Sequence, residues 1–269
     1  MKNNTFTLSV GATLVVAATL LAASCGSRSG KKTTLTVAEQ GADAAVGYPL
    51  PTAYEVTNLI NRSGAAYVIG ITNPAAKVES YLTETDKAVN LGIYGADLAY
   101  VTTYNMKQET MDYLKVLKLL VDELHVSSNF NTELARKVEN NIDNKDSLIN
   151  IISQSFYDTY SFLINNGKDD ISVLVLAGTW VEGLYLTAMA ATTSVRSADM
   201  LQIVANQKSS LATLVALLDK HSDAADVAQM RRVLEPIIRE YDKVKDTVSE
   251  AQALQISDTI EKIRNTLVK

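Results

Sequence analysis

Residues that build disulfides, metal sites and nucleophilic active sites are scarce in this sequence. Its 269 residues include one cysteine and two histidines, which excludes an internal disulfide. No His-x-x-x-His or Glu-x-x-His spacing occurs, so a metal site with nitrogen or sulfur ligands lacks its usual residues. A Gly-x-Ser-x-Gly motif and a glycine-rich phosphate loop are absent too. We therefore expect no metal, no other cofactor and no catalytic residues of a familiar type.

Helix-breaking residues and excess charge are also scarce. Four prolines and twelve glycines in the whole chain favour helix over most of its length. The net charge is −5; without the first 24 residues, which hold one lysine and no acid, 24 basic residues face 30 acidic ones. A mildly acidic chain of this kind is not expected to bind nucleic acid.

The first 25 residues have the pattern of a secretory signal peptide. Lys2 precedes an apolar run over residues 10–23 that is short for a membrane span, and small residues lead up to Cys25. The pattern resembles the lipobox of bacterial lipoproteins, with Ala22 where that motif usually has leucine. The resemblance implies cleavage after Ser24 and a lipid on Cys25. A plain secreted protein with an incidental cysteine is the alternative.

The same resemblance implies a location and a division of the chain. We expect an exported protein that the lipid on Cys25 anchors in the cell envelope. Because no acidic run follows the cysteine, we favour the periplasmic face of the outer membrane. Residues 1–24 would be the signal peptide, 25–50 the lipidated cysteine with a polar tether, and 51–269 a helical domain.

The helical domain has no segment that alternates polar and apolar residues for long enough to form a sheet. We predict an all-α bundle of eight to ten helices. A short segment, 65–71, is also expected to be helical. The main helices are expected at about residues 52–62, 73–82, 83–105, 107–126, 131–142, 146–164, 171–193, 197–221, 224–248 and 249–267.

The segment 171–193 is apolar on all sides and carries a single charge, Glu182. Such a helix is buried either by protein or by lipid. The central charge and the many small residues around it favour a core helix that neighbouring helices pack against closely. A membrane span is the alternative.

The C-terminal region has two regular apolar seams. Pro236 lies inside the first seam and predicts a kink or a join between helices. We expect residues 224–269 to form a helical hairpin within a monomer, with a dimeric coiled coil as the alternative. The seams consist of Val227, Met230, Leu234, Ile237, Tyr241, Val244 and Val248, and of Ile256, Ile260, Ile263 and Leu267.

Two stretches of the chain share a local pattern. Asp97 and Glu182 both lie among small and aromatic residues, and each is followed three places on by a tyrosine, Tyr100 or Tyr185. A duplicated helical unit would explain this and would give the fold two similar lobes, although similar composition alone could produce it. The two units would be residues 73–126 and 146–221.

Asp97 and Glu182 are the strongest candidates for a functional site. Each shares a helix face with apolar and aromatic residues, so each is expected to be partly buried and to need a partner. In one interpretation, the two acids line a cavity and bind a ligand, or serve as the acid and base of a glycosidase. In the structural interpretation, tyrosines and arginines satisfy each acid and fix the helix register.

The twelve tyrosines outnumber the four phenylalanines, and tyrosine suits clefts that are apolar on one side and wet on the other. The function we expect is a binding or scaffolding role for an envelope protein or a small ligand, without catalysis. A small-molecule site or a hydrolase at the two acids is the alternative. The cleft candidates are Tyr94, Tyr100, Tyr104, Tyr157 and Tyr160, and the candidate ligand-binding residues are Asp97, Tyr100, Tyr104, Trp180, Glu182 and Tyr185.

Overall fold

The computed structural model describes residues 48–126, 130–191, 194 and 197–269. Within them the chain forms ten α-helices and one 3-10 helix and no strand, which confirms the all-α prediction. The predicted signal peptide, Cys25 and most of the tether lie outside the described residues. The helices are α1 (Ala53–Arg62), the 3-10 helix η1 (Ala75–Ser80), α2 (Glu84–Thr103), α3 (Lys107–Glu123), α4 (Phe130–Asn140), α5 (Lys145–Asn165), α6 (Asp169–Ala191), α7 (Ser197–Lys220), α8 (Ala225–Val233), α9 (Glu235–Asp242) and α10 (Glu250–Leu267).

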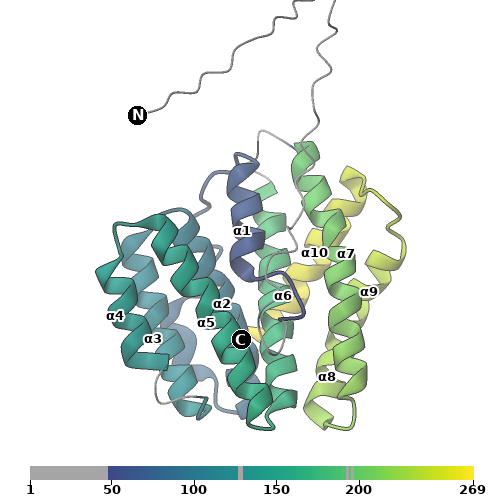
Figure 1. Ribbon diagram of the computed structural model, residues 1–269. Coiled ribbons are helices and arrows are strands. Elements are labelled where there is room, and N and C mark those ends of the chain that lie inside the picture. Colours follow the sequence, from purple (N-terminus) through teal and green to yellow (C-terminus); the bar gives the residue numbers. More distant parts are fainter. Residues whose placement is uncertain (1–47, 127–129, 192–193, 195–196) are drawn as a thin grey trace, which may run out of the picture. The chain divides into compact units, whose positions relative to one another are not determined.

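Helix α6 lies at the centre of this arrangement, where α1, α2, α7 and α10 pack against it (Figure 1). Its length and its mean hydropathy of 1.5 would suit a membrane span, but 94% of its most apolar stretch is buried inside the protein. The other helices bury this apolar surface, as the prediction of a core helix requires.

Helices α2 and α6 form the closest contact in the fold and run in the same direction. Gly92 of α2 lies against the backbone of Val175 and Thr179, and Gly178 of α6 lies against Val89. Because glycine has no side chain, the two helix backbones approach each other directly. Any polar side chain on the facing surfaces is therefore enclosed between the two helices.

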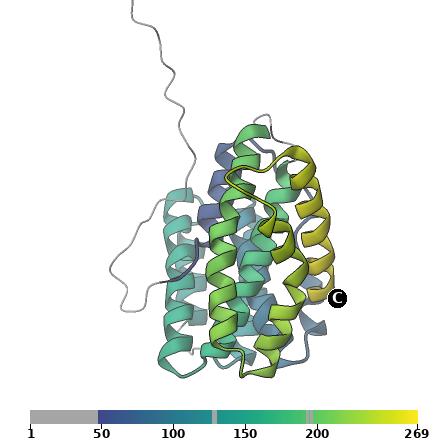
Figure 2. The ribbon, with the colours of Figure 1, turned by 90° about the vertical axis from the view of Figure 1, so that its right-hand side faces the viewer.

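The remaining helices flank this central pair. Figure 1 shows α3, α4 and α5 on one side of α6 and α7, α8 and α9 on the other. In Figure 2, α10 lies along the edge of the second group, and it packs on α6 and α9. Pro236 lies in the first turn of α9, so it marks a join between α8 and α9. All seven residues of the predicted 227–248 seam are buried.

The chain between α1 and α2, residues 63–83, is called the connector below. Its only regular part is η1, so the helix predicted at 65–71 is wrong and the helix predicted at 73–82 is a shorter 3-10 helix. Gly64 and Gly70 both have a φ of 80°, which interrupts a helix. The connector backbone instead forms hydrogen bonds with side chains of α2, α3 and α10, as described next.

Candidate functional site

The structure brings Asp97 of α2 and Glu182 of α6 together in the core. Both residues have 0% exposed surface, and they are near enough for Glu182 to raise the pKa of Asp97. The sequence could name these two acids but could not show that they lie close together. Their burial separates them from solvent, so this pair does not line an open cleft.

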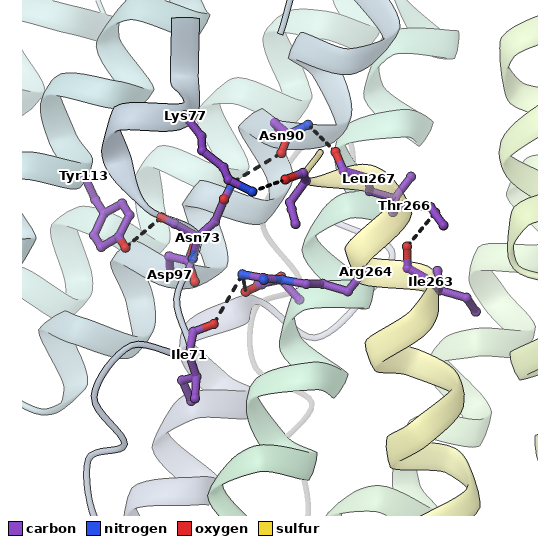
Figure 3. Close-up of polar contacts among 12 residues, drawn as sticks. Ile71, Asn73, Lys77, Asn90, Asp97, Tyr113, Ile263, Arg264, Thr266 and Leu267 are labelled. Atoms are coloured by element: carbon purple, nitrogen blue, oxygen red, sulfur yellow. Dashed lines mark hydrogen bonds and ion pairs between the residues drawn. The ribbon is translucent and has the colours of Figure 1, made fainter. Parts of the chain in front are cut away.

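Arg264 of α10 is the cationic partner of the pair. Its Nε donates to Glu182 Oε2 at 3.0 Å and its Nη2 donates to Glu182 Oε1 at 3.1 Å. Nη2 also donates to the backbone carbonyl of Ile71 in the connector at 3.2 Å (Figure 3). A two-pronged guanidinium contact of this kind fixes both the position and the orientation of the carboxylate. Arg264 is 7% exposed, so this is a buried ion pair.

The electrostatic surroundings of the two acids differ. Burial, followed by the nearby charge of Glu182, raises the pKa of Asp97 well above its ordinary range. Burial also raises the pKa of Glu182, but the Arg264 charge and its hydrogen bonds act in the opposite direction. Arg264 donates hydrogen bonds to Glu182 only, so it opposes the effect of burial more directly at Glu182 than at Asp97.

Asp97 also holds the connector. The backbone N–H of Asn73 donates to Asp97 Oδ2 at 3.0 Å, and the Tyr113 hydroxyl donates to the Asn73 carbonyl at 2.9 Å (Figure 3). The Asn73 side chain donates to the Tyr81 hydroxyl at 2.9 Å and to Asn90 Oδ1 at 3.4 Å. Buried backbone groups need partners, and here side chains from two helices supply them.

The candidate tyrosines Tyr100 in α2 and Tyr104 just after it also form hydrogen bonds with the connector backbone. The Tyr100 hydroxyl accepts a hydrogen bond from the backbone N–H of Val68 at 2.9 Å, and the Tyr104 hydroxyl donates to the carbonyl of Ala65 at 2.8 Å. The Tyr67 ring stacks on Tyr100 with 5.3 Å between ring centroids. Residues that the sequence suggested for a ligand thus bind a segment of their own chain.

The two candidate aromatic residues on α6 have different surroundings. Tyr185 lies below Arg264, whose guanidinium carbon is 4.7 Å from the ring centroid, so the ring adds a cation–π contact to the ion pair. Trp180 is 5% exposed and packs edge-on against Tyr241. Its Nε1 has no hydrogen-bond partner among the described residues. Trp180 therefore belongs to the core but not to the polar cluster.

Three important members of the cluster were not among the sequence candidates: Asn73, Tyr113 and Arg264. The signal for Arg264 was present, because it lies four residues after Ile260 and three before Leu267 and so falls on the apolar seam of its helix. A charge on a buried face needs a buried counter-charge. Asn73 gave no comparable signal, since its partners depend on the path of an irregular segment.

A separate cleft lies between α4 and α5, with a volume of about 590 Å³. Its volume is within the usual range of sites that bind small organic ligands. Both apolar and polar side chains line it. The lining residues are Val126, Glu133, Leu134, Lys137, Asn150, Ile151, Gln154, Ser155, Asp158, Thr159 and Phe162.

None of the tyrosines that the sequence suggested for a cleft lines the cleft between α4 and α5. Tyr94 and Tyr100 are fully buried, with 0% exposed surface. Tyr157 and Tyr160 pack edge-on against Tyr48, and Tyr48 and Tyr160 line a small apolar cavity of about 30 Å³ under α5. This small cavity shares Ser155 and Thr159 with the cleft, so the two are adjacent.

Fold and site together define an all-helical protein with a closed, ion-paired polar cluster and a separate surface cleft. Among the described residues, no group of three or more His, Cys, Asp or Glu side chains is placed to hold a metal ion. Comparisons with protein-family models, curated proteins and solved structures found no match to this chain.

Proposed function

We propose that this chain is a lipid-anchored protein of the bacterial cell envelope whose helical domain has a binding role and no catalytic chemistry. The lipobox-like sequence before Cys25 supports the anchor. The observation that carries the binding role is the cleft between α4 and α5, which has the size of a ligand site and mixes apolar and polar lining groups.

The geometry does not favour the alternative sites at Asp97 and Glu182. A glycosidase needs two carboxyl groups that flank the scissile bond of a bound sugar, and a ligand site must admit its ligand. Here both acids are fully buried, Arg264 binds Glu182, and Asn73 binds Asp97. The pair has the contacts of a structural element.

The chemistry of the cleft narrows the class of ligand. Val126, Leu134, Ile151 and Phe162 offer apolar surface, whereas Asn150 and Gln154 are exposed amides at its border. Glu133 is already paired with Arg136 at 2.7 Å. Asp158 accepts a hydrogen bond from the Gln154 amide at 2.8 Å and has no cationic partner in the described part of the chain. An amphipathic small molecule that is neutral or carries an amine fits this lining best.

Native mass spectrometry of the full chain, extracted gently from envelopes in detergent, tests the binding role. We expect an added mass that the Asn150→Trp variant loses, because the indole would fill the cleft. Asn165→Trp, the same change at an exposed position of α5 outside the cleft, should retain it. A protein without added mass, or one whose added mass survives Asn150→Trp, would contradict a ligand in this cleft.

The anchor requires its own experiment. Metabolic labelling with a radioactive fatty acid should label the wild-type chain, and Cys25→Ala should abolish the label and release the protein from the membrane fraction. Ser24→Ala, which keeps a small residue before the cysteine, should retain both label and membrane attachment. A Cys25→Ala chain that stays in the outer-membrane fraction would exclude the proposed lipid anchor.

A further inference from the structure

The polar cluster contains more acid than base. Two buried carboxyl groups, Asp97 and Glu182, lie close together at the α2–α6 interface. Among the described residues, Arg264 is the one basic side chain beside them, and it binds Glu182. All three residues are at least nine-tenths buried. Two ionised carboxylates close together inside a protein repel each other strongly, and one guanidinium cannot neutralise both.

The hydrogen bonds show which of the two acids carries a proton. Both oxygens of Glu182 accept from Arg264, as expected for a carboxylate. Asp97 Oδ2 accepts from the Asn73 N–H, but Oδ1 is buried and no donor among the described residues reaches it. A hydrogen on Asp97 Oδ1 that is donated to Glu182 would satisfy this oxygen and allow the two carboxyl groups to lie close together.

We infer that Asp97 and Glu182 hold a single proton between them, bound to Asp97, and that this proton keeps the connector fastened to the core. With the proton in place, the cluster contains one negative and one positive charge, Glu182 and Arg264. Without it, Asp97 would be a second buried anion at the residue that binds Asn73. An ionised Asp97 would accept the Asn73 N–H more strongly, but this one bond cannot offset the cost of a second buried anion. Hydration of that anion would require the connector, which Asn73 joins to Asp97, to move away from the core.

The other titratable groups around Asp97 are tyrosines from each neighbouring element. Burial raises the pKa of each of them, so they remain neutral wherever Asp97 could titrate. These tyrosines therefore do not account for a change in stability at moderately alkaline pH that disappears in an Asp97 variant. These tyrosines are Tyr67 and Tyr81 in the connector, Tyr94 in α2, Tyr113 in α3 and Tyr185 in α6.

The sign of the pH effect follows from proton linkage. Burial raises the pKa of Asp97 in the folded protein above that of the unfolded chain, so the folded state binds more protons between these two values. The contribution of this proton to the free energy of unfolding is fully present below the pKa of Asp97 in the unfolded chain, about 4. It is lost as the pH rises through the pKa of Asp97 in the folded protein. Asp97→Asn offers a neutral side chain that can donate to Glu182 and still accept from Asn73. This variant should not lose stability as the pH rises.

The experiment compares thermal unfolding of the full chain in detergent from about pH 5 to about pH 9. The wild-type Tm should fall across this range, while the Asp97→Asn curve should be flatter and lie at least about 3 °C higher at the alkaline end. Asp258→Asn removes one negative charge from an exposed site on α10 and should reproduce the wild-type slope. An Asp97→Asn protein that is less stable than wild type at every pH, or has the same slope, would overturn the inference.

Two further measurements separate a buried proton from a general effect on stability. Infrared spectroscopy should detect a protonated carboxyl group in the wild type and in Asp258→Asn that is missing in Asp97→Asn. Trypsin can cut the connector only at Lys77, its single basic residue. The rate of cleavage at Lys77 is divided by the rate for an unstructured peptide at the same pH, which corrects for the pH dependence of trypsin. This ratio should increase with rising pH in the wild type but not in Asp97→Asn. Equal infrared spectra, or equal acceleration in both proteins, would contradict the proposal.

Discussion

Gly92 of α2 and Gly178 of α6 face each other's helix backbone across the centre of the protein. A Cβ atom on Gly92 would lie 2.0 Å from the Val175 carbonyl oxygen, and one on Gly178 would lie 2.0 Å from the Val89 carbonyl oxygen. The contact is reciprocal, and in both directions the nearest atom belongs to the backbone. A side chain could not escape by rotating, so the helices would have to separate.

Substitution of either glycine should therefore destabilise the fold. We expect Gly92→Ala and Gly178→Ala each to lower the free energy of unfolding by about 3 kcal/mol, at the upper end of the usual cost of overpacking. Gly183→Ala in α6 is the matched control, because its Cβ would have its nearest contact at 4.0 Å. Alanine there should stabilise the helix by about 0.5–1 kcal/mol. Urea unfolding measures all three, and equal effects at 92, 178 and 183 would refute the close approach.

Removal of the Arg264 charge should lower the free energy of unfolding more than removal of a surface arginine does. Arg264→Met leaves Glu182 buried without its counter-ion, which typically costs about 3–5 kcal/mol. Arg239→Met removes an arginine whose side chain is 71% exposed and should change stability little. Chemical unfolding near neutral pH measures the free energy of unfolding of both variants. The double variant Glu182→Gln with Arg264→Met should be more stable than Arg264→Met alone, and a double variant that is less stable would contradict this account.

The Tyr100 hydroxyl should stabilise the fold through its hydrogen bond to the connector backbone. Tyr100→Phe keeps the stacked ring but leaves the Val68 N–H without its partner, which should cost about 1–3 kcal/mol. Amide hydrogen exchange at Val68 should become faster, while exchange in α7 should change only with global stability. Tyr157→Phe is the control, because the Tyr157 hydroxyl forms no hydrogen bond within the described residues. Unchanged protection of Val68 in Tyr100→Phe would show that the hydrogen bond is not needed.

The capping box at the start of α1 gives a prediction independent of the polar cluster. Thr52 Oγ1 accepts from the Glu55 N–H at 3.2 Å, and Glu55 Oε2 accepts from the Thr52 N–H at 2.7 Å. Thr52→Ala should cost about 1 kcal/mol because it exposes an unpaired donor in the first turn. Ser209→Ala, at an exposed position inside α7, should change stability by less than about 0.5 kcal/mol. A Tm shift no larger than that of Ser209→Ala would rule out a capping role for Thr52.

Most of the secondary structure could be predicted from the sequence, because it depends on local signals. The capping residues Thr52 and Ser249 begin α1 and α10, as their sequence context indicates. The 227–248 seam is buried because its spacing places all its members on one helix face. The predicted repeat units and the hairpin over 224–269 concern how such elements relate to each other, and they remain predictions.

The site could be predicted only in part, because partners depend on tertiary structure. Helical periodicity placed Asp97 and Glu182 on buried faces but could not show that these faces meet, or that Arg264, 82 residues after Glu182, completes the pair. The connector was the main error in the fold. Its local sequence allows helix between Gly64 and Gly70, but the tyrosines and Asp97 of later helices bind its backbone in an irregular path. Tertiary contacts override local preference there.

The position of Arg264 in α10, 82 residues after Glu182, has a consequence for biosynthesis. Every other charged member of the cluster has left the ribosome well before Arg264, so a growing chain holds two acids and no base at its future centre. The centre can close only when the last helix is nearly complete. A copy that ends before α10 would keep its acids hydrated and its connector open, and would remain a substrate for proteases. The ion pair at the core therefore waits for the synthesis of α10.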